Sequence, residues 1–504
     1  MDRSAFLYDR FLERFPYEPT SCQSALLSQV ASFLTSDDGD ILVVNGYAGT
    51  GKTTAVAAVI GAMTALEVPC VLLAPTGRAA KVLSLYAGRP ASTIHKHIYR
   101  QKSFGADGFG QFSLSFNKAR GALFIVDEVS LIGIDSSGKG GAFGSGNLLE
   151  DLVQFVRSGV DCRMILLGDA AQLPPVGLDA SPALAREYMS GFGGVSYATL
   201  TTVVRQAAGS GILVNATHLR SLLPSMEDGV GMSGQSGLSR SGLSLSGQSG
   251  LSLSELGLSG LSLSELGLSC TGFPDIERIA GGELLETLAD AYSRYGEEEV
   301  VVLCRSNKRA NRYNAGIRAQ VLYREEQLVR EDKLMIVKNS YACSLEGTDY
   351  IANGDMARLV WIRHFEERYG LHFADACLSF PDYGDQEVEM KVLLDTLLSE
   401  SPSLGYEESN ALYQGVLTDY AHLTTKKKRY EAVRSDPFFN ALQIKYAAAI
   451  TCHKAQGGQW KCVFVDNPFW QDFLVADDLK WLYTALTRAV KKVYLVNFPK
   501  ELFV

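Results

Sequence analysis

A glycine-rich segment at residues 46–53 constrains the fold of this chain more than any other feature. It reads Gly-Tyr-Ala-Gly-Thr-Gly-Lys-Thr and follows an apolar run at 41–44, so it matches G-x-x-x-x-G-K-[ST] between a strand and a helix. Its glycines let backbone N–H groups curl around phosphate oxygens, and the positive end of the following helix points at the same anion. The segment therefore predicts an α/β fold that binds a nucleoside triphosphate.

The side chains at the end of this segment suit a triphosphate and its metal ion. Lys52 would neutralise the β- and γ-phosphates, and the hydroxyl of Thr53 would ligate Mg²⁺. A glycine-rich turn with an idle lysine is the alternative that the motif alone leaves open. We expect ATP and Mg²⁺ as cofactors. The expected nucleotide contacts in this stretch are Gly46, Ala48, Gly49, Thr50, Gly51, Lys52, Thr53 and Thr54.

The bulk composition fits a multidomain protein without an overall basic field. The chain has 504 residues, of which 46% are hydrophobic, and carries a net charge of −9. This length supports several cores, in about two to four domains. The negative charge is weak evidence against a nucleic-acid partner, because a motor protein can confine its cations to one groove.

The cysteines do not indicate a metal centre or a disulfide framework. The chain has nine of them, an odd number, and no two have C-x-x-C spacing. The first residues contain no apolar signal region, and no apolar run approaches the ~18 residues of a membrane helix. We therefore expect a protein of a reducing compartment, the cytoplasm, without a membrane partner.

Two stretches of alternating strands and helices predict parallel sheets. The first runs from 41 to 176, and the second begins at 300–304 and resumes at 462–465 and 493–496. Such alternation is typical of a parallel sheet covered by helices. The strands expected in the first stretch lie at 41–44, 71–74, 123–126 and 164–167.

The residues between the parts of the second stretch have a different composition. Segments at 334–337, 357–362 and 372–380 are typical of antiparallel strands, and a charged helical run leads to the basic cluster 426–429. This composition predicts a small inserted β-rich domain. The basic cluster suits either phosphate contacts or a solvated helix face.

A low-complexity segment rich in Ser, Gly and Leu occupies 231–269. The decamer Ser-Gly-Leu-Ser-Leu-Ser-Glu-Leu-Gly-Leu occurs twice in tandem, from Ser249 and from Ser259. The Ser/Gly content favours a flexible, dispensable linker, although the regular leucine spacing leaves room for a short stacked-turn structure. A second Gly/Ser stretch at 136–146 is typical of a mobile loop.

Two carboxylates follow directly on the expected strand at 123–126. Asp127 and Glu128 would lie at the carboxyl edge of the sheet beside the glycine-rich loop, where Mg²⁺ and the attacking water are organised. We assign Asp127 to Mg²⁺ and Glu128 to the base that activates water. The alternative is a pair of carboxylates that merely cap a strand.

An amide follows the next buried strand. Gln172, in the run at 168–176, could contact both the γ-phosphate and the lytic water and so report whether the phosphate is present. Read alone, the same run is equally compatible with a proline-stopped turn.

Together with further motifs in the same order, these segments resemble superfamily 1 helicases, and most closely the RecD/Dda branch that moves 5′ to 3′ on single-stranded DNA. The resemblance covers nearly the whole chain except the low-complexity segment. The matching segments lie at 46–53, 74–80, 93–95, 127–130, 168–176, 205–206, 353–355, 450–457 and 483–489.

The resemblance implies two RecA-like motor domains with ATP in the cleft between them. It assigns Arg205 and Arg488 to the arginines that reach across the cleft to the transferring phosphoryl group. ATP binding would close the cleft and hydrolysis would release it. The resemblance also places Gln23 at the adenine, and Gln456 and Gly457 at the nucleotide.

The DNA contacts are expected in loops on the face opposite the nucleotide. Hydroxyl groups and cations bind the phosphate oxygens of DNA, which gives an affinity that does not depend on the base sequence. For His95 and His453, the alternative is a purely structural role. The expected contacts are Pro75, Thr76, Thr93, His95 and Lys96 in the first domain, and Thr451, His453 and Lys454 in the second.

Two insertions complete the expected fold. Alternation at 112–116 behind a glycine-rich stretch predicts a hairpin at 98–118, where the family carries the pin that splits the duplex. A hairpin packed on the motor core is the alternative. The insertion at 336–440 resembles the SH3-like module with which the family braces DNA.

The predicted domains are a first motor domain at 1–195, the first part of the second at 196–335, the insertion at 336–440, and the remainder of the second at 441–504. The resemblance implies a monomeric, ATP-dependent 5′-to-3′ DNA helicase of DNA repair, recombination or replication. Its partners would be single-stranded and tailed duplex DNA, with repair or nuclease-complex proteins. An ATP-driven translocase or RecD-like nuclease-complex subunit, and a superfamily 1 RNA helicase, are the alternatives.

Overall fold

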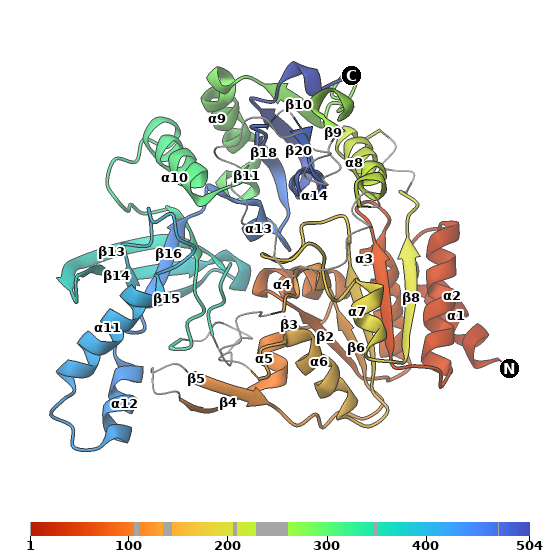
Figure 1. The fold of residues 1–504 in the computed structure, drawn as a ribbon, viewed down its shortest axis with the longest axis horizontal. Helices are drawn as coiled ribbons and strands as arrows, with labels where there is room; N and C mark the ends of the chain where they lie inside the picture. Colours follow the sequence, from red (N-terminus) through yellow and green to blue (C-terminus); the bar gives the residue numbers. More distant parts are fainter. Residues whose placement is uncertain are drawn as a thin grey trace, which may run out of the picture.

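The computed structural model describes residues 2–104, 110–134, 144–204, 209–227, 261–343, 345, 350–471 and 473–504. Two parallel sheets and a closed barrel make up most of these residues (Figure 1). No helix in these ranges is both long and apolar enough to cross a membrane.

The first parallel sheet contains the glycine-rich loop. Its six strands are arranged in the order β3-β2-β6-β7-β1-β8. The central strands contain buried apolar runs, at 41–44 in β1, 123–126 in β6 and 164–167 in β7, because helices cover both faces. The strands are β1 (Ile41–Gly46), β2 (Cys70–Ala74), β3 (Ala91–Thr93), β6 (Leu123–Val126), β7 (Arg163–Gly168) and β8 (Val195–Leu200).

Alternate side chains of β1 pack into different helix layers. Leu42 and Val44 pack with residues of the first three helices, whereas Ile41 and Val43 pack with α5 and α6 on the other face. The predicted α/β fold with parallel sheets is therefore confirmed. The helices of this half are α1 (Arg3–Arg14), α2 (Ser21–Thr35), α3 (Lys52–Ala65), α4 (Gly77–Ala87), α5 (Ile94–Ile98), α6 (Leu148–Arg157) and α7 (Arg186–Ser190).

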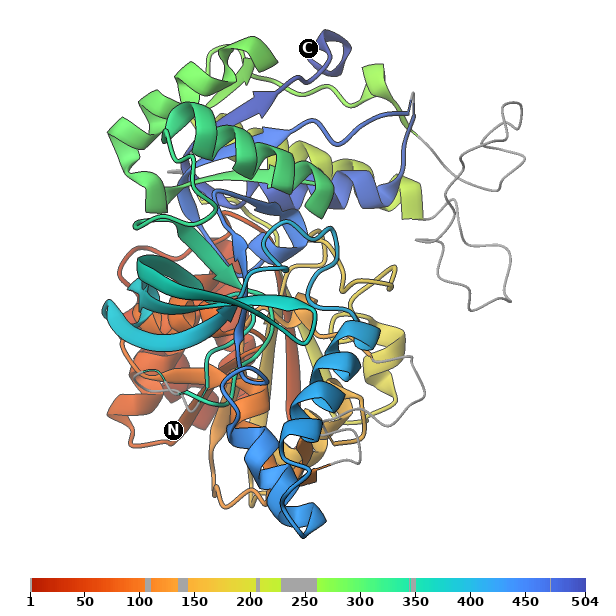
Figure 2. The ribbon, with the colours of Figure 1, turned by 90° about the vertical axis from the view of Figure 1, so that its left-hand side faces the viewer.

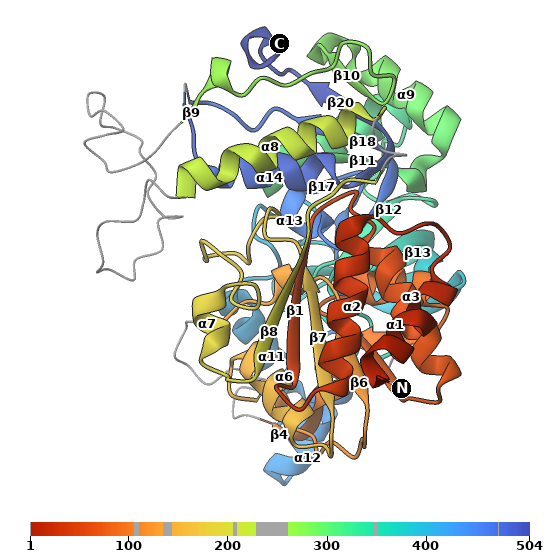
Figure 3. The same cartoon turned by 90° about the vertical axis from the view of Figure 1, so that its right-hand side faces the viewer.

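The second parallel sheet has five strands in the order β10-β20-β18-β11-β17. Val463 and Val465 face α8 and α14, which lie side by side in Figure 3, whereas Cys462 and Phe464 face α9 and α10. The strands are β10 (Ile276–Ile279), β11 (Val300–Cys304), β17 (Ala449–Thr451), β18 (Trp460–Asp466) and β20 (Ala489–Val496). The helices are α8 (Gly211–Glu227), α9 (Leu284–Tyr295), α10 (Asn307–Gly316), α13 (Cys452–Ala455) and α14 (Ala476–Leu486).

The closed barrel lies beside both sheets, and α11 and α12 extend from it along the first sheet (Figure 2). Its five strands pair antiparallel except for β15 with β16. Phe373, Leu412 and Phe438 pack the two helices against the barrel wall. The elements are β12 (Lys333–Ile336), β13 (Met356–Arg368), β14 (Leu371–Phe380), β15 (Gln386–Leu393), β16 (Leu442–Tyr446), α11 (Tyr406–Asp419) and α12 (Lys426–Ser435).

Two predicted boundaries differ from the sheets that the structure forms. The first sheet continues past residue 195, because β8 pairs with β1 up to Leu200. The barrel extends beyond 336–440 at both ends, because its closure requires β12 to pair with β16. Edge and closing strands are short and only partly apolar, so composition alone marks their limits poorly.

A hairpin lies at the predicted position 98–118. Its strands β4 (Tyr99–Phe104) and β5 (Gly110–Leu114) pair antiparallel, and its tip at 105–109 lies outside the described residues. The ring of Phe112 lies 5.5 Å from that of Tyr341, at the barrel. The hairpin therefore contacts the barrel as well as the first sheet.

The low-complexity segment is only partly within the described residues. Residues 228–260 lie outside them, as do 136–143 of the second Gly/Ser stretch. The remainder is packed: β9 (Leu261–Ser262) pairs with β19 (Phe473–Leu474), and Leu266 and Leu268 are fully buried in the core of the second sheet. The prediction of a flexible linker is wrong for 261–269, because Leu266 and Leu268 are packed in this core. That the segment is dispensable stays a prediction.

Candidate nucleotide site between the two parallel sheets

The loop after β1 is shaped by its glycines. Gly49 and Gly51 adopt φ values of +72° and +75°, in the left-handed region that favours glycine. A Cβ at Gly51 would also lie 2.3 Å from Nε2 of Gln23. Helix α3 begins at Lys52 with no side-chain cap on its first N–H groups. These backbone N–H groups can donate hydrogen bonds to a phosphate.

The side chain of Gln23 stabilises this loop through hydrogen bonds. Its Nε2 donates to the carbonyl oxygen of Thr50 at 2.9 Å, and its Oε1 accepts from the N–H of Thr20 at 2.9 Å. The side chain is buried. The structure thus gives the amide a role in holding the loop, and the expected adenine contact stays a prediction.

The two predicted carboxylates lie where β6 ends. Asp127 is buried; its Oδ2 accepts from the hydroxyl of Tyr86 on α4 at 2.6 Å, and its Oδ1 accepts from the N–H of Glu128 at 2.8 Å. Glu128 adopts a φ of +53°, which turns the chain sharply after the strand. Tyr86 therefore fixes the carboxylate that the sequence assigns to Mg²⁺.

The charged groups at this strand edge shift one another's pKa values. Burial lowers the pKa of Lys52, but Asp127, Glu128 and Asp169 outweigh burial, and the pKa of this lysine is raised. Burial raises the pKa of the Glu128 carboxyl, against the opposing effects of Lys52 and Arg488. The ammonium group therefore stays charged among carboxylates, ready for an anionic ligand.

Two buried acceptor atoms in this region have no hydrogen-bond partner among the described residues. They are Oε2 of Glu128 and Oε1 of Gln172. These residues follow β6 and β7, which are neighbours in the sheet. Buried acceptors are normally paired with protein or water. The two atoms therefore suit a bound water molecule, as the sequence predicts.

Arg488 reaches the same place from the second sheet. It is buried, and its guanidinium donates to the carbonyl oxygens of Thr484 and Gly458 at 3.2 and 3.3 Å. Among the described residues no carboxylate forms an ion pair with it. A buried, unneutralised guanidinium facing Lys52 and Glu128 suits a phosphate. The other predicted arginine, Arg205, lies outside the described residues.

Direct hydrogen bonds join the two sides of this cleft. The hydroxyl of Tyr483 on α14 accepts from the N–H of Ala48 at 2.9 Å and donates to Oδ2 of Asp169 at 2.7 Å. The N–H of Leu173 donates to Oγ1 of Thr484 at 2.8 Å. The sequence analysis assigns no role to Tyr483, although this residue lies inside a matched motif.

Gln456 contacts the loop after β7, and Gly457 packs against the start of α4. Nε2 of Gln456 donates to the carbonyl oxygen of Leu173 at 2.7 Å. A Cβ at Gly457 would lie 3.0 Å from Cβ of Ala79 and 3.3 Å from Oγ1 of Thr76. The expected nucleotide contact of both residues stays a prediction.

The predicted DNA contacts lie at the carboxyl ends of β2, β3 and β17. The structure corrects their expected position on the face opposite the nucleotide. Parallel strands end at one edge, so the loops after β2 and β3 share the edge of the glycine-rich loop and are displaced sideways from it. The residues are Pro75 and Thr76 after β2, Thr93, His95 and Lys96 after β3, and Thr451, His453 and Lys454 after β17.

Several of these side chains are already engaged or half-buried. Thr76 and Thr93 cap α4 and α5, and Thr93 also bonds the hydroxyl of Tyr350. Burial lowers the pKa of His453, and it lowers the pKa of Lys454 to about 8. The set therefore forms a partly covered strip rather than an exposed basic patch.

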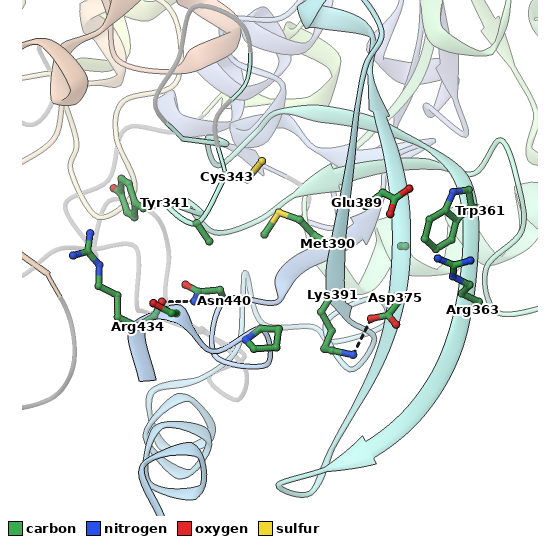
Figure 4. Close-up of a pocket in the computed structure, with 14 residues that line it drawn as sticks. Tyr341, Cys343, Trp361, Arg363, Asp375, Glu389, Met390, Lys391, Arg434 and Asn440 are labelled. Carbon is green, nitrogen blue, oxygen red and sulfur yellow. Dashed lines mark hydrogen bonds and ion pairs between the residues drawn. The ribbon is translucent and has the colours of Figure 1, made fainter. Parts of the chain in front are cut away.

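A separate pocket of about 700 Å³ lies on the barrel (Figure 4). Its charged groups are largely neutralised, since Lys391 pairs with Asp375 at 2.8 Å. The Arg363 guanidinium lies 4.2 Å from the centre of the Trp361 ring. None of the predicted site residues lines this pocket, so the barrel pocket is distinct from the cleft.

Comparisons with known proteins agree with this division of the chain. The family described as an AAA domain matches residues 23–224, and the UvrD-like helicase C-terminal domain matches 446–496. The ATP-dependent RecD2 DNA helicase of Deinococcus radiodurans is 37% identical over 202 residues, which are 40% of this chain. The match spans 24% of that relative, about a quarter of its length.

Solved structures of low identity also align along the chain. The Pif1 helicase from Bacteroides in complex with ADP-AlF3 and single-stranded DNA shares 15% identity, with 97% of this chain and 95% of that chain covered and a TM-score of 0.45. The Pif1 helicase from Candida albicans shares 15% identity over 97% of both chains, with a TM-score of 0.37.

The matched families cover the two structural halves of the site. The first holds the loop after β1, Glu128 and Gln172, and the second holds the strip after β17 and Arg488. The chain is similar to the RecD-like helicases of superfamily 1.

Proposed function

We propose that this protein is an ATP-dependent DNA helicase that translocates 5′ to 3′ on single-stranded DNA. The observation that carries the proposal is the convergence of Lys52 and Glu128 from the first sheet with Arg488 from the second. A triphosphate between them would meet two cations and a base, and Gln172, which follows the neighbouring strand, would be the polar sensor. The two sheets then act as RecA-like motor domains, and the barrel is inserted in the second of them.

Hydrolysis follows from these groups. Water held by the unpaired oxygens of Glu128 and Gln172 attacks the γ-phosphorus and transfers its proton to Glu128, while the bond between the γ-phosphorus and the bridging oxygen breaks. A raised pKa makes the Glu128 carboxylate a better proton acceptor. Lys52 and Arg488 stabilise the charge that develops on the phosphoryl oxygens. Arg205 would act as a second such arginine.

The residues present also fit Mg²⁺. The exposed hydroxyl of Thr53 on the first turn of α3 and the buried carboxylate of Asp127 are the hard oxygen donors that this ion prefers. When bound, Mg²⁺ would neutralise charge on the β- and γ-phosphates. Tyr86 holds the Asp127 carboxylate in place for it.

DNA as the substrate is supported by the name of the RecD2 relative and by the strip after β2, β3 and β17. The hairpin β4–β5 and the barrel flank this strip, because Phe112 contacts Tyr341 and Lys81 of α4 pairs with Asp382 at 2.9 Å. We assign the hairpin to the pin that splits the duplex and the barrel to the SH3-like brace.

Unwinding of tailed duplexes tests this function. Two DNA duplexes, one with a 5′ and one with a 3′ single-stranded tail, are incubated with ATP, with a Lys52→Ala variant as control and an RNA-tailed duplex beside them. Separation of the 5′-tailed DNA alone is the expected result. ATP hydrolysis stimulated by DNA without separation of either duplex would favour the translocase or complex-subunit alternative.

A further inference from the structure

The segment 456–460, which joins α13 to the first residue of β18, contacts three parts of the cleft. At its start, Gln456 bonds the carbonyl oxygen of Leu173 beside Gln172. Next, Gly457 packs on the first turn of α4. The segment thus lies between the hydrolytic site and the helix that begins at the proposed DNA strip.

Arg78 of α4 is inserted into this segment. Its guanidinium carbon lies 4.1 Å from the centre of the Trp460 ring, and Nη2 lies 3.5 Å from the carbonyl oxygen of Gln459. A Cβ at Gly458 would lie 2.6 Å from Nε of Arg78, so a glycine is needed there for the arginine to fit. Trp460 is buried, with 1% of its surface exposed. The contact is therefore close and largely shielded from water.

The contact is unusual for a half-buried arginine. Among the described residues no carboxylate forms an ion pair with Arg78, and burial lowers its pKa. The guanidinium is therefore held by its stack on the indole ring and by the carbonyl oxygen of Gln459, and not by a carboxylate.

The other side of the same segment holds Arg488. The Nη1 of Arg488 donates to the carbonyl oxygen of Gly458, and the N–H of Trp460 donates to the carbonyl oxygen of Arg488 at 2.9 Å. The residues that receive Arg78 are therefore those that hold Arg488. A shift of Arg78 changes the backbone on which Arg488 rests.

Arg78 also lies next to the proposed DNA strip. Helix α4 begins at Gly77, its N-cap is Thr76, and Pro75 precedes the cap. A strand bound at Pro75 and Thr76 would displace the first turn of α4, and Arg78 with it.

We propose that Arg78 is a positioning residue that transmits DNA occupancy at the start of α4 to Arg488 through residues 458–460. The inference rests on the proposed function, because it assumes that Arg488 acts on ATP and that DNA binds after β2. It assigns to Arg78 the stimulation of ATP hydrolysis by single-stranded DNA, and neither ATP binding nor DNA grip.

Steady-state ATP hydrolysis of an Arg78→Met variant tests the proposal. Methionine keeps an unbranched apolar stem against Trp460 and removes the charge and the donors. We expect the stimulation of kcat by single-stranded DNA to fall about tenfold, with KM for ATP and Kd for a labelled oligonucleotide within about twofold of wild type. Arg78→Lys should restore part of the stimulation.

A double variant separates transmission from simple damage. If Arg78 acts through Arg488, Arg78→Met should cause no further loss of stimulated kcat in an Arg488→Lys background. The matched control is Arg186→Met, which removes an arginine stacked 4.6 Å from the Tyr197 ring of the same domain. This control should keep full stimulation.

The outcomes distinguish the two proposals. Wild-type protein without DNA-stimulated ATP hydrolysis would overturn the proposed function and this inference together. Normal stimulation in Arg78→Met, or independent losses in the double variant, would overturn this inference alone. Loss of oligonucleotide binding in both Arg78 variants would also overturn it, since the residue would then be part of the grip.

Discussion

The hydroxyl of Tyr483 donates a hydrogen bond to Asp169 across the cleft, and the two oxygens lie 2.7 Å apart. The same hydroxyl accepts from the N–H of Ala48 in the glycine-rich loop. One side chain of the second sheet therefore holds both the loop and the carboxylate that precedes Gln172.

Removing this hydroxyl should slow hydrolysis without unfolding the protein. Tyr483→Phe keeps the buried ring but loses one neutral and one charge-assisted hydrogen bond, together of the order of 2 kcal/mol. We expect kcat/KM for ATP to fall about tenfold. Tyr197→Phe, which loses a single weak bond far from the cleft, should hydrolyse ATP normally. Equal rates for both variants would show that the bridge has no role in hydrolysis.

Replacing the proposed base should separate binding from hydrolysis. Glu128→Gln keeps the shape of the side chain but cannot accept a proton, so ATP and DNA should bind while kcat falls about 10²- to 10⁴-fold. Filter binding and phosphate release measure the two properties. Glu187→Gln, on the exposed part of α7, is the control. A Glu128→Gln variant that hydrolyses ATP rapidly would remove Glu128 as the base.

DNA affinity should depend on pH through Lys454. Burial lowers the pKa of its ammonium group to about 8, so the cation is present below that pH and is lost as the pH rises through it. We therefore expect the oligonucleotide to bind more weakly at about pH 9 than at about pH 7, with one fewer phosphate contact in the salt dependence.

Lys454→Arg provides the control for this prediction, because a guanidinium stays charged over the same range. Fluorescence anisotropy of a labelled single strand measures the affinity. Lys445, whose pKa is also lowered to about 8, faces Lys454 and titrates beside it. Full pH dependence in Lys454→Arg would assign the effect to Lys445 or to another group.

Residues 261–269, at the end of the low-complexity segment, should stabilise the folded protein. Leu268 is fully buried in the core of the second sheet, so Leu268→Ala should lower the free energy of unfolding by about 2–5 kcal/mol. Leu261, which is half-buried, is the control and should cost less when replaced by alanine. Denaturant unfolding measures both. Equal stability of Leu268→Ala and wild type would support a dispensable linker after all.

The elements that the sequence predicted well are those whose signal is local. The loop after β1 is encoded by adjacent glycines and Lys52, and Glu128 and Gln172 directly follow strands of continuous apolar residues. The sheet edge then brings these residues together, because parallel strands end on one side. Their positions therefore follow from the motif and the fold class.

The contacts that the sequence missed depend on long-range packing. Tyr483 meets Ala48 across 435 residues of chain, and Tyr86 reaches Asp127 from a helix of another strand–helix unit. Neither pair has a spacing that a pattern can detect. The packed copy of the repeat was missed for the same reason, since Leu266 and Leu268 are buried by α8 and the end of the chain.

The barrel is tied to the second sheet at both of its ends. Strand β16 is followed after Ala447 and Ala448 by β17, and Ala448 accepts a backbone hydrogen bond from Val302 of β11. At the other end, Lys333 donates to the carbonyl oxygens of Glu297, Glu298 and Val300. The barrel is therefore anchored to the second sheet through both of its connections. In the proposed motor, a rotation of the second sheet would carry the barrel with it, and the displacement would reach Tyr341 beside the hairpin, far from the bond whose hydrolysis releases the energy.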